Sequence, residues 1–234
     1  MGSSAADWAL QAPVFAQGYR VMTLDLRAHG QSSDPGDWFT VERLADDVAE
    51  WLGQLNEPPA HVVGLSLGGC TGLALALRHP ARLRSLTLVN AFARYRPTGR
   101  NGLMRQLKRT WLLLTTPMPT VAAFIASGLF PKPDQQRFRE AAMASLGQNR
   151  KRTYFASMRA LSVFDVRAQL PSLGVPTFII AGDRDTTIAP AAQHLLQRSI
   201  PNAHLLIAHD SGHATPYDQS EWFNRVVLEF IGGH

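Results

Sequence analysis

The amino-acid sequence predicts an α/β fold in which a mostly parallel sheet is flanked by helices. Short apolar runs rich in β-branched residues alternate with segments of helical periodicity, as expected when helices connect parallel strands. The chain has 234 residues, enough for one domain with a sizeable core. Its 45% hydrophobic and 18% charged residues are typical of a globular protein.

The expected elements alternate in both the first and the last third of the chain. Residues 19–24 read as an apolar strand, and residues 41–55 have the 3.6-residue periodicity of an amphipathic helix. Further strands are expected at 61–65, 83–89, 175–181 and 204–208, and further helices at 67–78, 190–199 and 220–231.

The alternation stops between Ala93 and Arg159. Five prolines break this segment into several short helices, which predicts a helical cap at residues 93–159 inserted into a core formed by residues 1–92 and 160–234. Ligands of such sheets bind beyond the carboxyl ends of the strands. We therefore expect the cap to enclose a ligand pocket.

The expected strand at 61–65 runs into Gly-Leu-Ser-Leu-Gly at residues 64–68, directly before a helix. Small residues before and after the serine leave room for a sharp turn, which holds Ser66 in a strained conformation. The turn places the hydroxyl at a helix N-terminus, where developing negative charge is favoured. Ser66 is therefore the candidate nucleophile.

A serine hydroxyl needs a base to take its proton and a third group to orient that base. Two later strands run into loops that offer such groups. The first loop contains Asp183 and Asp185, and the second contains His209 and His213.

The order of serine, acid and late histidine resembles the α/β-hydrolase family. The likeness covers most of the chain, including the Asp-Leu-Arg-Ala-His-Gly-Gln-Ser turn at 25–32 and Arg-His-Pro at 78–80. The resemblance implies that Asp185 is the acid and His213 the base, with Asp183 as a loop residue and His209 as an alternative base. It implies no cofactor and no metal.

A serine at this position implies acyl transfer to water, because relatives that open epoxides or displace halides carry an aspartate there. The expected substrate is a small carboxylic ester or lactone, or a thioester, cleaved through an acyl-enzyme on Ser66. Hydrolysis of a carbon–carbon bond and perhydrolase activity use the same triad and stay open as alternatives. Phe92, Tyr95 and Trp111 are candidate substrate-binding residues.

The oxyanion hole is the incomplete part of the expected site. The backbone amide of Leu67 supplies one donor, and in the family a strand ending in His-Gly, between those at 19–24 and 61–65, supplies the second. Residues 2–8 resemble the stretch that follows that motif, with Ser3 or Ser4 as a helix cap, so the second donor is absent or is Met1. We expect either that an upstream segment is missing here or that the chain is a truncated, weakly active or ligand-binding relative.

The expected cap is strongly basic. Residues 94–159 contain thirteen lysines and arginines against two acidic residues, a charge of +11 within a total of +5, which leaves −6 elsewhere. This asymmetry suggests an anionic substrate, an acidic carrier protein or an anionic membrane surface as partner, with a solvated face as the alternative. No nucleic-acid-binding module is recognised, so nucleic acid is not expected.

The cysteine content and the first eleven residues indicate the cellular compartment. The single cysteine, Cys70, excludes an internal disulfide and fits a reducing environment. Residues 1–11 lack the basic start and apolar run of a secretory signal. We therefore expect a cytoplasmic protein.

Overall fold

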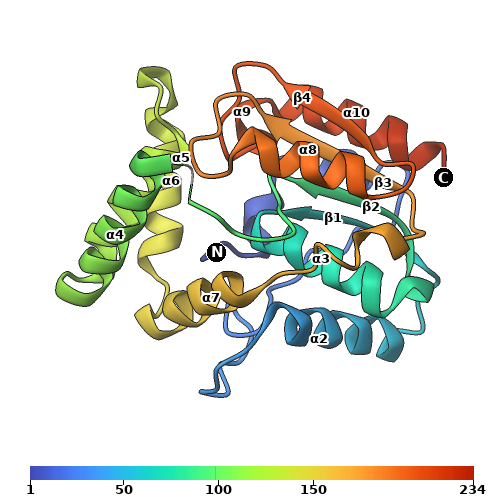
Figure 1. Ribbon diagram of the computed structural model, residues 1–234, viewed down its shortest axis with the longest axis horizontal. Helices are drawn as coiled ribbons and strands as arrows, with labels where there is room; N and C mark the ends of the chain where they lie inside the picture. Colours follow the sequence, from blue (N-terminus) through green and yellow to red (C-terminus); the bar gives the residue numbers. More distant parts are fainter. Residues whose placement is uncertain (98) are drawn as a thin grey trace.

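A parallel sheet forms the centre of the protein in a computed structural model that describes residues 1–97 and 99–234 (Figure 1). The sheet has four strands in the order β1-β2-β3-β4, and all neighbouring pairs are parallel. The strands are β1 (Ala60–Leu65), β2 (Leu83–Val89), β3 (Thr177–Gly182) and β4 (His204–Ala208).

Helices cover both faces of the sheet and extend beyond one end of it. The α-helices are α1 (Ala12–Phe15), α2 (Val41–Gln54), α3 (Leu67–Arg78), α4 (Gly99–Thr115), α5 (Met118–Leu129), α6 (Gln136–Gly147), α7 (Lys151–Val163), α8 (Pro190–Ser199), α9 (Thr215–Asp218) and α10 (Ser220–Gly232). Short 3-10 turns are η1 (Ala5–Trp8), η2 (Pro80–Arg82), η3 (Pro133–Gln135) and η4 (Leu170–Ser172). Within the described ranges, no helix is both long and apolar enough to cross a membrane.

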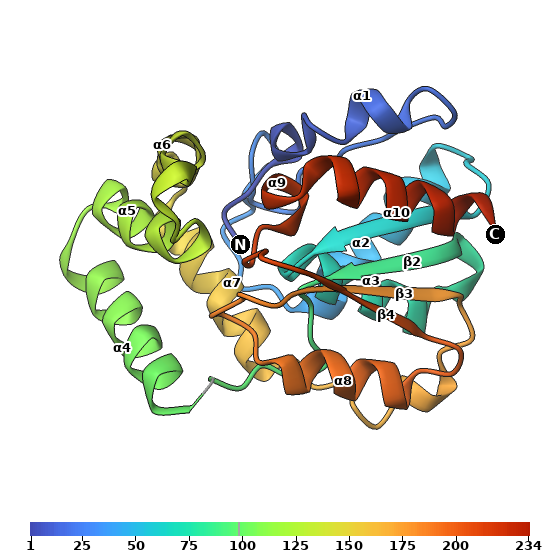
Figure 2. The same ribbon diagram turned by 90° about the horizontal axis from the view of Figure 1, so that it is seen from above.

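Two hydrophobic clusters bind the helices to the sheet. On one face, α2, α3 and α8 contribute buried side chains such as Leu44, Leu73 and Leu196. On the other face, α1 and α10 pack Phe15 and Phe223 against the strands. Figure 2 shows the sheet between these two layers. Burial of both faces explains why the central strands have nearly continuous apolar sequences.

Helices α4 to α7 gather at one end of the molecule, beside the sheet rather than on its faces (Figures 1 and 2). Buried residues of α4, α5 and α7, including Leu113, Val121 and Tyr154, form a third hydrophobic cluster. Helix α7 continues to Val163, past the boundary expected at residue 159. The division into a core and a cap stays a prediction.

The strand predicted at residues 19–24 is absent, and this prediction was wrong. Residues 20–26 have no regular secondary structure, and residues 20–24 line the same cavity as the edge strand β1. A strand requires a neighbour that pairs with its backbone. Among the described residues none pairs with 19–24, so its apolar sequence alone does not make it a strand. The expected parallel sheet and flanking helices are confirmed.

Candidate active site

Ser66 connects β1 to α3 in a strained turn. Its φ of 53° and ψ of −111° lie in a region that residues with a side chain rarely adopt. A Cβ on Gly64 would lie 2.4 Å from the carbonyl oxygen of Gly68, and a Cβ on Gly69 would lie 2.6 Å from the Cβ of Ala91 and 2.8 Å from the carbonyl oxygen of Gly64. The turn therefore requires glycine at both positions.

Gly68 differs from the expectation that small residues are needed on both sides of the serine. A Cβ built on Gly68 meets no atom within 4 Å. The residue borders an open cavity, so the space that the turn needs is at Gly69 instead. The prediction that the turn needs a small residue at position 68 was therefore wrong by one residue, because the close contacts are at Gly69.

The turn fixes the backbone around Ser66. The Ser66 amide donates to the carbonyl of Val89 at 2.9 Å, which joins the turn to the end of β2. Helix α3 begins at Leu67, and the first amides of a helix have no acceptor within the helix. The Leu67 amide and the helix dipole can therefore stabilise negative charge next to the serine hydroxyl.

His213 and Asp185 form a buried pair in the loops after β4 and β3. His213 Nδ1 lies 2.7 Å from Asp185 Oδ2, and the two side chains are 8% and 3% exposed. The other oxygen, Asp185 Oδ1, accepts hydrogen bonds from the amides of Thr187 at 2.6 Å and Ile188 at 3.1 Å. Both carboxylate oxygens are engaged, so the acid is fixed and orients the imidazole.

The alternative acid and base lie together at the surface. His209 Nδ1 is 3.3 Å from Asp183 Oδ2, and the His209 side chain is 90% exposed. Neither residue lines the cavity that contains Ser66 and His213. The structure therefore places Asp185 with His213 and keeps Asp183 with His209.

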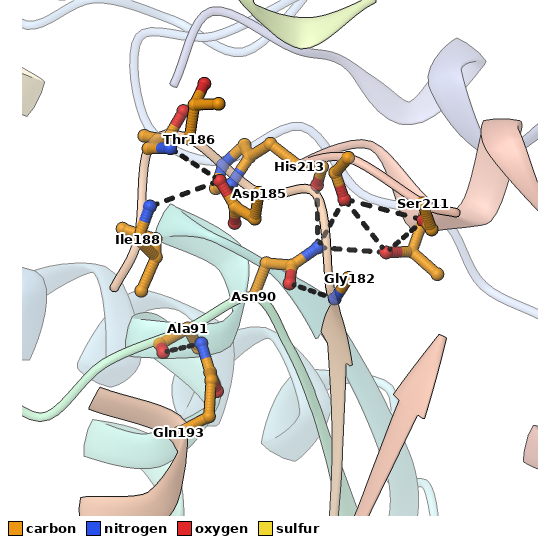
Figure 3. A network of polar contacts seen from close by, with 12 residues as sticks. Asn90, Ala91, Gly182, Asp185, Thr186, Ile188, Gln193, Ser211 and His213 are labelled. Atoms are coloured by element: carbon orange, nitrogen blue, oxygen red, sulfur yellow. Dashed lines mark hydrogen bonds and ion pairs between the residues drawn. The ribbon is translucent and has the colours of Figure 1, made fainter. Parts of the chain in front are cut away.

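Asn90, directly after β2, links the loops that carry the acid and the base (Figure 3). Its Oδ1 accepts from the Gly182 amide at 2.9 Å, at the end of β3. Its Nδ2 lies 2.9 Å from the His213 carbonyl, 3.0 Å from Thr215 Oγ1 and 3.3 Å from the Gly212 carbonyl. Asn90 is fully buried with a φ of 46°, a conformation that asparagine tolerates well.

Sequence reasoning missed Asn90. The signal available was a polar residue at the carboxyl end of an apolar strand, where ligands and catalytic groups gather. Its role depends on two loops more than ninety positions away in sequence. A local pattern cannot reveal such contacts.

Ser66 and His213 open onto a large cavity of about 720 Å³. Ser66, Leu67 and His213 line it together with residues of α4 to α7. The cavity continues along the outer edge of β1, between that strand and residues 19–24. The expected enclosure of a pocket between the sheet and residues 93–159 is therefore present in the structure.

The structure brings some of the predicted binding residues to this cavity but not others. Tyr95, Leu67 and Met1 line it. Phe92 is 2% exposed and instead lines a separate, smaller pocket. Trp111 is 59% exposed and does not line the cavity, because it lies on the outer face of α4. The prediction that Phe92 and Trp111 line the substrate pocket was therefore wrong.

Two cations of α4 face the cavity. Arg105 and Arg109 both line it, with Gln106 between them. Arg105 Nη1 donates to Thr186 Oγ1 at 2.6 Å, beside the acid loop. Arg109 Nε and Gln106 Oε1 are buried and have no hydrogen-bond partner among the described residues. A buried donor without a partner is costly, so this end of the cavity suits an anionic group.

Tyr154 borders the same end of the cavity as Arg109. Burial raises the pKa of the Tyr154 phenol above its usual value. The side chain therefore stays neutral near pH 7, and its hydroxyl can donate a hydrogen bond to a bound anion.

Fold and site together define a hydrolase of the α/β class. A sequence model described as alpha/beta hydrolase fold matches residues 1–219, and the chain belongs to this family.

Two curated relatives span nearly the whole chain. It is 30% identical to 3-oxoadipate enol-lactonase 1 of Acinetobacter baylyi, over 99% of this chain and 85% of the relative. It is 32% identical to a protein of Stutzerimonas stutzeri named "Putative carbamate hydrolase RutD", over 99% of this chain and 88% of that one.

Two solved structures have the same fold as this chain. An enol-lactonase from Burkholderia xenovorans LB400 has a TM-score of 0.89 at 27% identity, covering 99% of this chain and 88% of that chain. A hydrolase from Pseudomonas aeruginosa also has a TM-score of 0.89, at 32% identity, with coverages of 99% and 86%.

Proposed function

We propose that the protein is a serine hydrolase that cleaves a small carboxylic ester or lactone bearing an anionic group. The observation that carries the proposal is the buried His213–Asp185 pair, at 2.7 Å, whose histidine lines the same cavity as Ser66. Because Nδ1 of His213 is bound to the carboxylate, Nε2 is the nitrogen left to exchange a proton with the serine.

The proposed reaction proceeds in two halves. Ser66 Oγ attacks the substrate carbonyl while His213 accepts the hydroxyl proton, and the Leu67 amide stabilises the resulting oxyanion. Collapse of this intermediate expels the alcohol, which takes the proton from His213, and leaves an acyl group on Ser66. Water then attacks the acyl group with His213 again as base, releasing the acid and restoring the serine.

Arg109 supports an anionic substrate. Its Nε is buried and unpartnered within the described part of the chain, and the guanidinium borders the cavity. A carboxylate on the substrate would supply the missing acceptor with a charge-assisted hydrogen bond. An ester or lactone with a free carboxylate fits this arrangement better than a neutral one.

Covalent labelling tests the nucleophile. A fluorophosphonate probe should modify the wild-type protein, and Ser66→Ala should abolish the modification. Ser127→Ala is the matched control, because Ser127 lines the same cavity on α5 and should leave labelling unchanged. Absence of labelling in the folded wild type, or persistence in Ser66→Ala, would reject the proposal and favour a ligand-binding protein.

A pair of esters tests the anionic group. We expect a p-nitrophenyl ester of a dicarboxylic acid to be preferred over its neutral analogue, and Arg109→Gln to reduce that preference by about ten- to a hundredfold. Arg100→Gln, on the same helix but outside the cavity, controls for long-range steering. If both variants lost the preference for the anionic ester equally, the effect would be due to net charge and not to direct contact with Arg109.

Carbamate hydrolysis is the second candidate, favoured by the name of the 32% identical relative. A carbamate presents the same carbonyl to Ser66, and attack gives a carbamoyl-enzyme that water can resolve. Parallel assays of a carbamate and an ester of matched size distinguish the two candidates.

A further inference from the structure

Helix α4 carries an apolar stripe on its solvent-facing side. Leu103, Met104, Leu107, Trp111 and Leu114 are 47%, 60%, 55%, 59% and 68% exposed. At 100° per residue these five positions fall within an arc of about 100°. A surface helix normally turns such an arc inward, so an outward apolar stripe needs a physical explanation.

The inner face of α4 is already occupied. Leu112 and Leu113 are buried in the cluster with α5 and α7. Arg105 and Arg109 line the active-site cavity. The stripe is therefore additional to the helix's contacts with the rest of the protein, and Figures 1 and 2 place α4 at the outer end of the molecule.

Cations accompany the stripe. Arg100 and Lys108 are both exposed, the first in line with the stripe and the second at its edge. Helix α4 contains no acidic residue. If two copies of the chain met antiparallel across the middle of this stripe, the two Lys108 side chains would lie near the twofold axis with no acidic residue on α4 to offset them, which disfavours a second copy as occupant.

We propose that the exposed face of α4 docks on an anionic lipid surface. Leucine and methionine side chains would enter the boundary between headgroups and acyl chains, and Trp111 would lie at the headgroup level. Arg100 would contact lipid phosphates, and Lys108, whose Nζ lies 5.2 Å from the centre of the Phe124 ring, would add positive charge at the edge of the stripe. The helix lies in the plane of the interface, and the opposite face keeps its contacts with the cavity.

Vesicle sedimentation tests the docking. The 234-residue protein should co-sediment with vesicles of phosphatidylcholine and phosphatidylglycerol at 3:1, and at least tenfold less with pure phosphatidylcholine vesicles. Binding to the anionic vesicles should weaken severalfold in high salt, because screening removes the electrostatic part.

Two variants locate the surface. Leu107→Glu combined with Leu114→Glu should reduce binding to anionic vesicles at least tenfold, since it removes apolar area and adds negative charge. Val163→Glu is the matched control: Val163 is 60% exposed on α7, outside the stripe, and its replacement should leave binding unchanged. Circular dichroism should show the same fold for all three proteins, and labelling of Ser66 in solution should be unaffected.

Several outcomes would overturn the proposal. These are no binding to anionic vesicles, equal binding to both vesicle types, or an equal loss in Val163→Glu. A dimer in sedimentation velocity that the double variant abolishes, without vesicle binding, would assign the stripe to a second copy. Binding to an acidic carrier protein but not to vesicles would assign it to a protein partner.

Discussion

Replacing Asn90 with alanine tests whether this side chain positions the acid and base loops. Asn90 links the Gly182 amide to the carbonyl of His213, from a fully buried position. Alanine removes the side-chain amide, so the Gly182 N–H and the His213 carbonyl each lose a hydrogen-bond partner. The loops should then lose their common anchor while the strands stay paired.

The size of the effect follows from the contacts. A side-chain amide has two N–H donors and one carbonyl, so at most two of its three nearby acceptors are bonded at once. Each buried group left unsatisfied costs about 1–3 kcal/mol. Alanine at a φ of 46° adds about 1 kcal/mol of backbone strain. The Gly182 amide and the His213 carbonyl each lose a partner, so we expect the free energy of unfolding to fall by about 3–7 kcal/mol.

Two further variants separate the hydrogen bonds from the backbone. Asn90→Gly tolerates the positive φ and isolates the loss of hydrogen bonds. Asn202→Ala is the matched control, because Asn202 has a φ of 57° but is exposed in a turn. It should cost about 1 kcal/mol or less.

Guanidinium unfolding, followed by tryptophan fluorescence and circular dichroism, measures these differences. The rate of fluorophosphonate labelling gives a second readout, which should fall on the order of tenfold in Asn90→Ala because His213 is less well oriented. If Asn90→Ala lies within about 1 kcal/mol of Asn202→Ala, the network does not anchor the loops and the reasoning is refuted.

Three further predictions concern the serine turn, the cysteine and acid stability. Gly64→Ala should destabilise the protein by about 2 kcal/mol or more, while Gly68→Ala should fold normally, because only the former Cβ would collide with backbone; thermal melts distinguish them. Burial raises the pKa of the Cys70 thiol to about 12, so iodoacetamide should label it only after unfolding, as mass spectrometry would reveal. Hydrogen bonds from Arg78 lower the pKa of Asp46 below 3.8, so its stabilisation is present above that pH and lost as pH falls through the lowered value. Asp46→Asn should therefore destabilise by up to about 1 kcal/mol at pH 7, with a smaller difference near pH 2; no change with pH would contradict this.

Elements with a strong local pattern were predicted to the residue. The bounds of α3, β2, α8 and β4 agree with the expected 67–78, 83–89, 190–199 and 204–208. Their apolar periodicity and their ends are properties of adjacent residues. The segment 19–24 failed because a strand also depends on a pairing partner, which its own residues do not encode.

The same distinction between local patterns and distant contacts applies to the candidate site. Ser66, Asp185 and His213 could be proposed from motifs at strand ends, and the structure brings the acid and histidine together. Asn90 and Arg109 could not be singled out, because their significance depends on contacts between distant segments. Trp111 illustrates the converse: an aromatic residue predicted for the pocket lies on the outside of the helix whose other face lines it.

The basic residues within 94–159 do not all have the same role, because each cation has different contacts. Arg139 donates to the Phe130 carbonyl at 2.9 Å and so stabilises the turn after α5. Lys132 pairs with Asp210, and Arg159 lies 5.6 Å from the centre of the Trp38 ring. These cations are engaged by the protein itself.

Arg109 and Arg100 differ from them, because one borders the cavity and the other accompanies an apolar surface stripe. A net charge of +11 would predict equal sensitivity to the loss of any of these residues. The contacts predict instead that substrate preference depends on Arg109, lipid binding on the α4 stripe with Arg100, and stability on Arg139. The three readouts should therefore separate by position although each substitution removes the same unit charge.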